Sequence, residues 1–272
     1  MPASQTEIDD RNASFWDELC GTTLAKQLGV ADDSPESLAR FDRYYLDLYP
    51  YLEGYLPEKG AGEERLLEIG LGYGTVSQIL ASRGFDYNGL DIAPGPVEMV
   101  RHRLRLLGID GAEERVQAGS VLEAPHPDQS FDHVIAIGCL HHTGDLAGAV
   151  GEVQRILRPG GRALVMIYNK NSWRRMRMAA RAAPGKLLGR SHEVDEEMRG
   201  AYDRNTGGEA APATEYTSVR GVRELFSEFS EVSARRENFD QPRLLSRVLP
   251  RERLLGLPAH LAGLDLYITA TK

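Results

Sequence analysis

Short apolar runs alternate with longer helical stretches between residues 65 and 170, and this alternation constrains the fold more than any other feature. The apolar runs have the length and composition of strands and occupy residues 66–69, 87–90, 115–118, 133–137 and 162–167. Most of them are separated by stretches of helical character, at 75–82, 96–107 and 146–157. Strands and helices in alternation are typical of a parallel sheet with helices on both faces.

The segments on either side of this core follow other patterns. Residues 1–60 predict a helical cap, in which Ser34 is the N-cap of one helix. Residues 171–215 contain no strand-type run and predict a helical insertion, or lid, after the fifth strand. The C-terminal part, 216–272, supplies two further strand-type runs, at 231–234 and 264–270. We therefore expect an α/β fold in which the core at 61–170 and the C-terminal part form a Rossmann-like, seven-stranded, mostly parallel sheet.

The chain has the composition of a soluble globular protein, with 42% hydrophobic and 26% charged residues. A net charge of −8 argues against general nucleic-acid binding, because phosphate neutralisation needs a positive surface. The N-terminus lacks the features of a signal peptide and no apolar run could span a membrane, so we expect a cytoplasmic protein without stable membrane anchoring. Cys20 and Cys139 lack metal-ligand spacing, which predicts no bound metal. The sequence leaves open whether the chain forms a homo-oligomer.

The first predicted strand leads into a glycine-rich loop with the pattern Glu-x-Gly-x-Gly-x-Gly, at residues 68–74. Glycines allow positive φ angles and let a ligand approach the backbone closely. Asp91 ends the second predicted strand, where a carboxylate can accept hydrogen bonds from both hydroxyls of a ribose. The loop and Asp91 together predict a nucleoside-containing cofactor, whereas the loop alone also fits a tight turn between a strand and a helix.

Two residues favour S-adenosylmethionine over a dinucleotide as this cofactor. A dinucleotide fingerprint carries a third glycine at the position of Thr75. The Glu68 carboxylate would repel a pyrophosphate, whereas it suits the ammonium group of a methionine moiety. An NAD-dependent oxidoreductase is therefore the less favoured alternative.

Several motifs in residues 61–170 occur in a familiar order. The segment 66–74 and the run Gly89-Leu90-Asp91-Ile92 come first, followed by 130–135 with Leu140-His141-His142 and by 157–162. In these motifs the chain resembles the class I S-adenosylmethionine-dependent methyltransferases. The resemblance implies that the last strand runs antiparallel beside strand five, an arrangement that the two C-terminal runs fit.

The resemblance also implies a role for each motif residue. Glu68 would hold the methionine end of the cofactor together with three glycines of the loop, Gly70, Gly72 and Gly74. Asp91 would hold the ribose, and Ile92 would pack against the adenine. Members commonly carry an acid after the third strand that meets the adenine amino group, but Ser120 stands at this position here. We expect further cofactor contacts from Thr75, Ser120, Val121 and Gly138.

The acceptor should lie beyond the carboxyl ends of the strands, as ligands of open α/β sheets do. His141 and His142 follow strand four there and are candidates for a general base, because histidine titrates near neutral pH. His141 matches in place the base of some small-molecule O-methyltransferases of this fold, although relatives also carry both histidines without an established basic role. Other side chains expected to line the acceptor, unless they belong to the core, are Trp16, Tyr45, Tyr168 and Asn169.

Residues 173–190 form a basic segment that contains six cations and no acid. Such a segment can dock an anionic acceptor, a membrane surface or a partner peptide, or it can be a solvated helix face. If it functions, we expect Arg174 and Arg175 to bind a carboxylate or phosphate of the acceptor.

These features predict an S-adenosylmethionine-dependent methyltransferase for a small or peptidic metabolite, anionic if the basic segment binds it, in specialised metabolism. A nucleic-acid methyltransferase is disfavoured by the acidic chain and by the lack of an Asn/Asp-Pro-Pro-Tyr run after strand four. An S-adenosylmethionine-binding regulator or partner subunit without turnover is the other alternative, because a binding motif does not by itself establish turnover.

Overall fold

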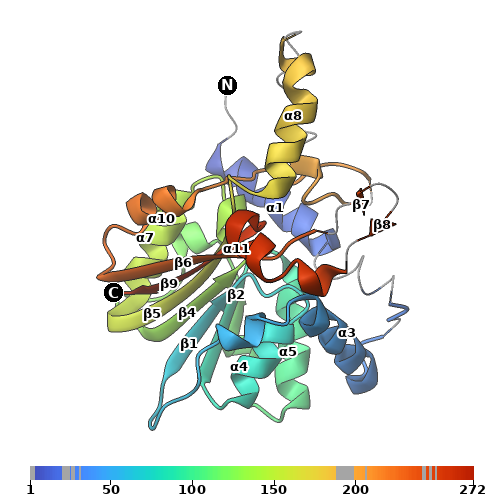
Figure 1. The fold of residues 1–272 in the computed structure, drawn as a ribbon. Helices are drawn as coiled ribbons and strands as arrows, with labels where there is room; N and C mark the ends of the chain where they lie inside the picture. Colours follow the sequence, from blue (N-terminus) through green and yellow to red (C-terminus); the bar gives the residue numbers. More distant parts are fainter. Residues whose placement is uncertain are drawn as a thin grey trace.

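A seven-stranded sheet forms the centre of the molecule (Figure 1). The computed structural model describes residues 4–19, 25, 28–30, 32–187, 199–205, 207–240, 243–244, 247–248 and 250–272. The strand order is β3-β2-β1-β4-β5-β9-β6. The strands are β1 (Arg65–Ile69), β2 (Asp86–Asp91), β3 (Val116–Ala118), β4 (Phe131–Ile137), β5 (Leu157–Tyr168), β6 (Glu231–Glu237) and β9 (Asp265–Thr271).

The pairing directions confirm the predicted Rossmann-like, mostly parallel sheet. Strands β3, β2, β1, β4 and β5 pair in parallel, and β9 runs antiparallel to both of its neighbours, β5 and β6. Ile69 pairs with Leu90 of β2 and with Ala136 of β4. The loops after β1, β2 and β4 therefore leave the sheet at one edge, which is where the sequence predicts the cofactor.

Helices cover both faces of this sheet. The covering helices are α4 and α5 on one face and α7 and α10 on the other, with the bounds Thr75–Ser82, Pro94–Leu106, Leu146–Ile156 and Val219–Leu225. Leu80 and Val100 join one buried apolar cluster, while Val153 and Val222 join the other. Burial of two separate apolar faces explains why the central strands are apolar almost throughout. The short helix α6 (Ala112–Arg115) precedes β3.

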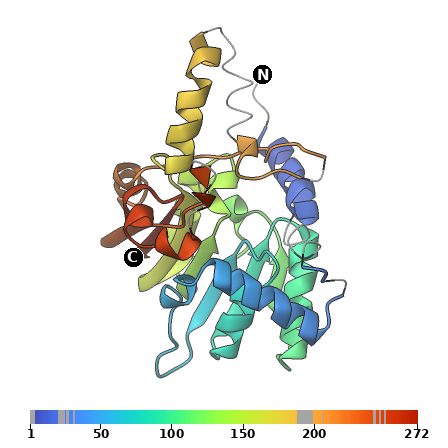
Figure 2. The same ribbon diagram turned by 45° about the vertical axis from the view of Figure 1, so that its right-hand side comes forward.

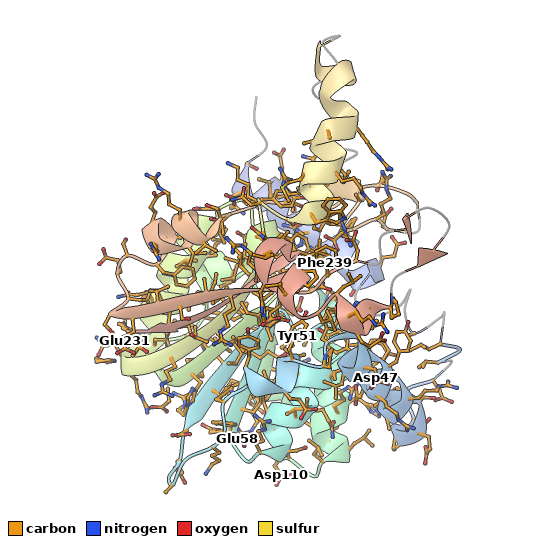
Figure 3. The ribbon with its side chains drawn as sticks, in the orientation of Figure 1. Asp47, Tyr51, Glu58, Asp110, Glu231 and Phe239 are labelled. Atoms are coloured by element: carbon orange, nitrogen blue, oxygen red, sulfur yellow. The ribbon has the colours of Figure 1, made fainter. Side chains whose placement is uncertain are left out.

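The N-terminal part consists of α1 (Gln5–Leu19), α3 (Pro35–Leu48) and the 3-10 turn η1 (Leu52–Gly54). The predicted N-cap forms, because the Ser34 hydroxyl accepts a hydrogen bond from the Ser37 amide at 3.4 Å. Helix α1 lies against α5. The Tyr51 ring, which is labelled in Figure 3, packs edge-on against Tyr267 of β9, with 5.4 Å between ring centroids, and so joins this part to the sheet.

The chain after β5 leaves the sheet as α8 (Trp173–Leu187), which projects from the body of the molecule (Figure 2). Residues 199–217 return to the sheet, where Thr217 forms an isolated bridge with Asn169. In the described part of 203–217 we find no helix, so the predicted insertion is helical only in part. Residues 188–198 and Thr206 lie outside the described residues, as does Cys20.

The C-terminal part contains elements that the sequence did not predict. Two strands of two residues each, β7 (Arg243–Leu244) and β8 (Arg247–Val248), pair antiparallel. The 3-10 turn η4 (Arg251–Arg253) follows, and α11 (Leu257–Ala262) packs against β6. Such short strands carry too few residues for an alternating pattern to reveal them.

The described residues lack two kinds of feature. None of their helices combines the length and the apolar character needed to cross a bilayer. Among the same residues, no group of His, Cys, Asp and Glu side chains is arranged to hold a metal ion.

Candidate active site

A cavity of about 770 Å³, counted with the part that opens to solvent, lies beyond the carboxyl ends of β1, β2 and β4. Its wall includes part of α1, which contributes Asp9, Asn12 and Trp16. The core contributes Ile69, Gly70, Gly72, Leu90, Asp91, Ile92, Gly119, Ser120, Val121, Ile137, Gly138, Cys139, His142 and Thr143.

The predicted site residues divide into two groups by this cavity. Those that line it are Trp16, Gly70, Gly72, Asp91, Ile92, Ser120, Val121, Gly138 and His142. Those that do not are Tyr45, Glu68, Gly74, Thr75, His141, Tyr168, Asn169, Arg174 and Arg175. Of the predicted cofactor contacts, Glu68, Gly74 and Thr75 therefore lie outside the lining of the cavity.

The three glycines of the loop all have positive φ, for different physical reasons. A Cβ at Gly70 would come within 2.5 Å of Cys139 Cβ, and one at Gly74 would come within 2.7 Å of Arg103 Cδ. At Gly72, where φ is +54°, a Cβ would meet no protein atom within 4 Å. Gly72 therefore leaves open space beside the backbone of the cavity floor, as close approach of a ligand requires.

Asp91 is held at the end of β2 by backbone amides. Its two carboxylate oxygens accept hydrogen bonds from the Leu71 amide at 2.7 Å and the Ala93 amide at 2.9 Å. Burial raises the pKa of Asp91, and these amides oppose the rise. Each carboxylate oxygen has further lone pairs, so Asp91 can still accept hydrogen bonds from a ligand in the cavity.

Glu68 lies behind the loop. Its Oε2 accepts hydrogen bonds from the Ser77 and Tyr87 hydroxyls, each at 2.6 Å, and only 3% of the residue is exposed. Burial raises the pKa of Glu68 to about 7, against the effect of these two hydroxyls. Thr75 also faces away from the cavity, since its hydroxyl donates to Asp42 at 2.7 Å. Both residues shape the loop from behind in this structure.

The part of the cavity that follows β2 and β3 is suited to a flat apolar group. Ile92 and Val121 line it from the loops after β2 and β3. Ser120 occupies the position of the family's acid, and its hydroxyl accepts a hydrogen bond from the Leu122 amide at 3.4 Å. Gly138, with φ of +80°, completes the wall after β4.

The two histidines after β4 have different surroundings within the 3-10 turn η3 (Leu140–His142). His141 is fully buried, both ring nitrogens lack a hydrogen-bond partner, and burial lowers its pKa well below the usual value. His142 lines the cavity, and its Nδ1 lies 2.8 Å from the Ala213 carbonyl oxygen. Burial lowers the pKa of His142, while Asp203 and the Ala213 carbonyl oppose this.

Tyr168 and Asn169 contact the insertion and the C-terminal part. The Tyr168 hydroxyl donates to Asp203 Oδ2 at 3.0 Å. Asn169 donates to the Gly263 carbonyl at 2.8 Å and accepts from the Asn171 amide at 3.0 Å, so its side chain holds the exit from β5. Tyr45 packs among apolar side chains next to Phe41 and Tyr49.

Arg174 and Arg175 fasten the base of α8. Arg174 pairs with Asp240 at 3.1 Å and lies over the Tyr202 ring at 4.7 Å. Arg175 lies over the Tyr216 ring at 3.8 Å. The side chains of Lys186 and Arg190 in the basic segment lie outside the described residues.

The predicted site residues did not include Asp9, Asn12 and Asp203, three polar residues near the cavity, and Cys139 lines it from the segment after β4. Asn12 donates to the His142 carbonyl at 2.7 Å, and Cys139 donates to the Ile69 carbonyl at 3.1 Å. Burial raises the pKa of the Cys139 thiol, which favours the uncharged form. Only a contact between α1 or the insertion and the core brings the other residues here, and no sequence motif announces such a contact.

The cavity fits S-adenosylmethionine. Gly72 leaves room for a ligand against the backbone, Asp91 presents hydrogen-bond acceptors, and Ile92 with Val121 offers apolar surface. These are the surroundings that a methionine chain, a ribose and an adenine require.

Comparison with known proteins agrees with this fit. Residues 67–165 match the family described as Methyltransferase domain. A demethylmenaquinone methyltransferase from Tropheryma whipplei is 32% identical over 109 residues, which are 40% of this chain and 43% of that protein. A 27-O-demethylrifamycin SV methyltransferase from Amycolatopsis mediterranei is 32% identical over 156 residues, 56% of this chain and 54% of that protein. The chain thus spans about half the length of the curated relatives it matches.

Solved structures share the fold at lower identity. A SAM-dependent methyltransferase from Thermotoga maritima has 22% identity and a TM-score of 0.53, over 85% of this chain and 90% of that one. A SAM-dependent methyltransferase from Archaeoglobus fulgidus has 14% identity and a TM-score of 0.52, over 85% and 94%. The matched domain and the shared fold agree with the motifs of the sequence, which resemble those of the class I S-adenosylmethionine-dependent methyltransferases, and residues 67–165 of this chain form a methyltransferase domain.

Proposed function

We propose that this protein transfers a methyl group from S-adenosylmethionine to a small-molecule acceptor. The observation that carries the proposal is the cavity between the glycine loop and Asp91, which is lined mostly by residues of the matched domain at 67–165. When bound, S-adenosylmethionine supplies a methyl group activated by a sulfonium. The protein's own contribution is to position the two reactants and to exclude water.

The cavity residues suggest how the cofactor would be held. Asp91 would accept hydrogen bonds from the ribose, and Ile92 with Val121 would pack against the adenine. The backbone at Gly70 and Gly72 would lie against the methionine chain. Glu68 would act from behind the loop, where its hydrogen bonds with Ser77 and Tyr87 hold it.

A hydroxyl-bearing acceptor is the class that we favour. The wall formed by Asn12, Trp16 and His142 lies at the α1 side of the cavity, and no lysine or arginine occurs among its described lining residues. Two relatives bear names that specify transfer to oxygen, the rifamycin methyltransferase and a ubiquinone biosynthesis O-methyltransferase from Saccharophagus degradans that is 29% identical over 126 residues. The cavity therefore gives less support to an anionic acceptor than to a neutral one.

Titration calorimetry with S-adenosylmethionine tests the cofactor. We expect Asp91→Asn to weaken binding by about tenfold to a hundredfold, because a charge-assisted hydrogen bond contributes about 1.5–3 kcal/mol. Asp86→Asn is the matched control, since Asp86 begins the same strand and pairs with Arg65 and Arg115 instead of lining the cavity. Equal affinities of the two variants would contradict the assigned role of Asp91.

Formation of S-adenosylhomocysteine with a panel of phenols, alcohols and amines tests turnover. Tight cofactor binding without product across the panel would favour the regulatory alternative. Binding of NAD without binding of S-adenosylmethionine would overturn the proposal.

A further inference from the structure

A cluster of buried polar side chains, which we call the His142 cluster, joins the core to the insertion. It consists of His142 in η3, Tyr168 at the end of β5 and Asp203 in the segment after α8. The Tyr168 hydroxyl donates to Asp203 Oδ2 at 3.0 Å, and the same oxygen lies 3.7 Å from His142 Nε2. The side chains of His142 and Asp203 are 4% and 15% exposed. The cofactor contacts proposed above use none of these three groups.

Hydrogen bonds fix the tautomer of His142. A carbonyl oxygen can only accept, so the Nδ1 that lies 2.8 Å from Ala213 O must carry a hydrogen. In the neutral ring, Nε2 then holds a lone pair, and this atom is buried without a hydrogen-bond partner. An unpartnered buried acceptor is costly, which points to a ligand or a step of the reaction that supplies it with a hydrogen.

Asn12 presents a second acceptor of this kind on the same wall. Its Nδ2 donates to the His142 carbonyl oxygen at 2.7 Å, which leaves Oδ1 as an acceptor. Asn12 Oδ1 is also buried without a partner. Both acceptors belong to residues that line the cavity, although both atoms are covered in this structure, and a ligand that brings hydrogen-bond donors, such as a hydroxyl group, would satisfy them once neighbouring side chains shift.

Asp203 lies near the ring nitrogen of His142 that would take up a proton. At 3.7 Å from Nε2 its carboxylate is beyond hydrogen-bond distance of the neutral ring, which has no hydrogen there to donate. A proton on Nε2 would supply both the donor and the opposite charge. The Tyr168 hydroxyl donates to the same carboxylate oxygen and helps to hold it there.

We propose that His142 is the general base for a hydroxyl-bearing acceptor, and that Asp203, carried by the insertion, is a positioning residue that stabilises the protonated ring. This inference rests on the proposed function, because it needs a methyl donor in the cavity. His141 is not the general base in this proposal, since it is fully buried and does not line the cavity.

The step balances without any further reactant. The acceptor oxygen forms its bond to the methyl carbon as the carbon–sulfur bond breaks, and the electron pair of that bond leaves with the sulfur. The hydroxyl proton passes to His142 Nε2, so the positive charge moves from the sulfonium to an imidazolium beside Asp203. Because Nε2 is covered in this structure, the acceptor reaches it only when neighbouring side chains shift.

Asp203 is the acidic group that pairs with the His142 ring, and the other rings around His142 carry no negative charge. His141 and Tyr168 lie beside it, with ring centroids at 4.2 and 5.7 Å, and α1 contributes the uncharged ring of Trp16 at 4.6 Å. Asp9 of α1 lines the same cavity. Burial lowers the pKa of His142 and so keeps the ring neutral at pH 7, whereas Asp203 acts to raise it. Loss of the Asp203 charge should therefore lower this pKa further.

Nitrogen NMR of the full chain with ¹⁵N-labelled histidine tests the tautomer and the coupling, with His142→Gln to assign the signal among the seven histidines. At pH 7 we expect a neutral ring with hydrogen on Nδ1, and in Asp203→Asn a lower titration midpoint. Asp240→Asn is the matched control, because Asp240 pairs with Arg174 and loosens the same insertion without facing His142. Hydrogen on Nε2 at pH 7, or a midpoint that Asp240→Asn lowers as much as Asp203→Asn, would overturn the inference.

A kinetic arm uses S-adenosylmethionine with catechol and hydroquinone as probes. With a probe that is methylated, we expect kcat to fall by about a hundredfold or more in His142→Gln and by about tenfold in Asp203→Asn. The acidic limb of the kcat profile should also shift to lower pH in Asp203→Asn, which a merely structural role would not cause. An unshifted limb would contradict the role of Asp203.

The NMR and kinetic experiments can fail independently, so a failure of the His142 inference is distinguishable from a failure of the proposed function. Failure to bind S-adenosylmethionine would refute the proposed function while the NMR result still reports the His142 pair. A confirmed tautomer with no methylation of either phenol would overturn the choice of a hydroxyl-bearing acceptor.

Discussion

Gly72 shows how one residue can be selected for space outside the protein chain. Gly70 and Gly74 lie where a side chain would collide with Cys139 and Arg103, so packing alone explains the lack of a Cβ there. Gly72 has a left-handed backbone but no such neighbour, and its open side belongs to the cavity. The glycine that matters most for the ligand is therefore the one with the fewest protein contacts.

This distinction predicts the effect of Gly72→Ala. A left-handed alanine costs roughly 1 kcal/mol of stability, and the new methyl group also occupies ligand space. We expect S-adenosylmethionine affinity to fall at least about tenfold in calorimetry, because the methyl group meets the ligand closely. Gly160→Ala is the matched control: Gly160 has φ of +79° and equally open surroundings, but it lies at the start of β5, away from the cavity. The control should lose similar stability and no affinity; equal affinity losses would contradict the role assigned to Gly72.

At the scale of elements, α8 illustrates how a charge pattern can mislead. The basic segment suggests anion binding when it is viewed alone, yet Asp240, Tyr202 and Tyr216 neutralise or cover the arginines at its base. These partners all come after the end of the helix in the sequence, and Asp240 comes only after the strand β6. Charge balance across such a separation depends on the fold, so the composition of the segment does not determine it.

We therefore expect Arg175→Ala to affect stability. Arg175 lies 3.8 Å over the Tyr216 ring, and such a contact contributes about 0.5–1 kcal/mol. The unfolding temperature should fall by about 1–4 °C. Arg181→Ala provides the control on the same helix, since Arg181 is exposed. The result to measure is the difference between the two melting curves, and a larger loss in Arg181→Ala would show that the aromatic contact does not hold the helix.

The difference between local sequence pattern and contacts that depend on the fold also explains how much of the fold the sequence could predict. Strands β1 to β5 follow from apolar runs at regular spacing, and the Ser34 cap follows from local chemistry. The antiparallel direction of β9 was implied by family resemblance and not by any property of the run itself. The contacts of Asp203 and Asn12 depend on where the insertion and α1 come to rest, which local pattern does not encode.

The molecule as a whole buries several carboxyl groups around one edge of its sheet. Burial raises the pKa of both Glu68 and Asp265 to about 7, from usual values of 4.5 and 3.8. Between the usual and the raised value, the folded chain holds protons that the unfolded chain releases. Folding stability must then fall as pH rises through this window and level off above about 7. Deprotonation destabilises the core.

Glu68→Gln isolates one part of this dependence. The Gln oxygen can still accept hydrogen bonds from the Ser77 and Tyr87 hydroxyls, so the fold should persist. Relative to wild type, the variant should gain stability steadily as pH rises from about 4.5 to 7, by up to about 3 kcal/mol in total.

Urea unfolding at several pH values between 5 and 8.5 measures this gain as a difference between two proteins. The buried histidines have lowered pKa values and act in the opposite sense, since their stabilising effect is lost as pH falls. Because both proteins contain them, their effect cancels in the difference. Glu58→Gln serves as control, since it makes the same substitution at a side chain that is 80% exposed. A flat difference for Glu68→Gln would show that Glu68 is ionised in the folded protein throughout this range, and hence that its two hydroxyl donors outweigh its burial.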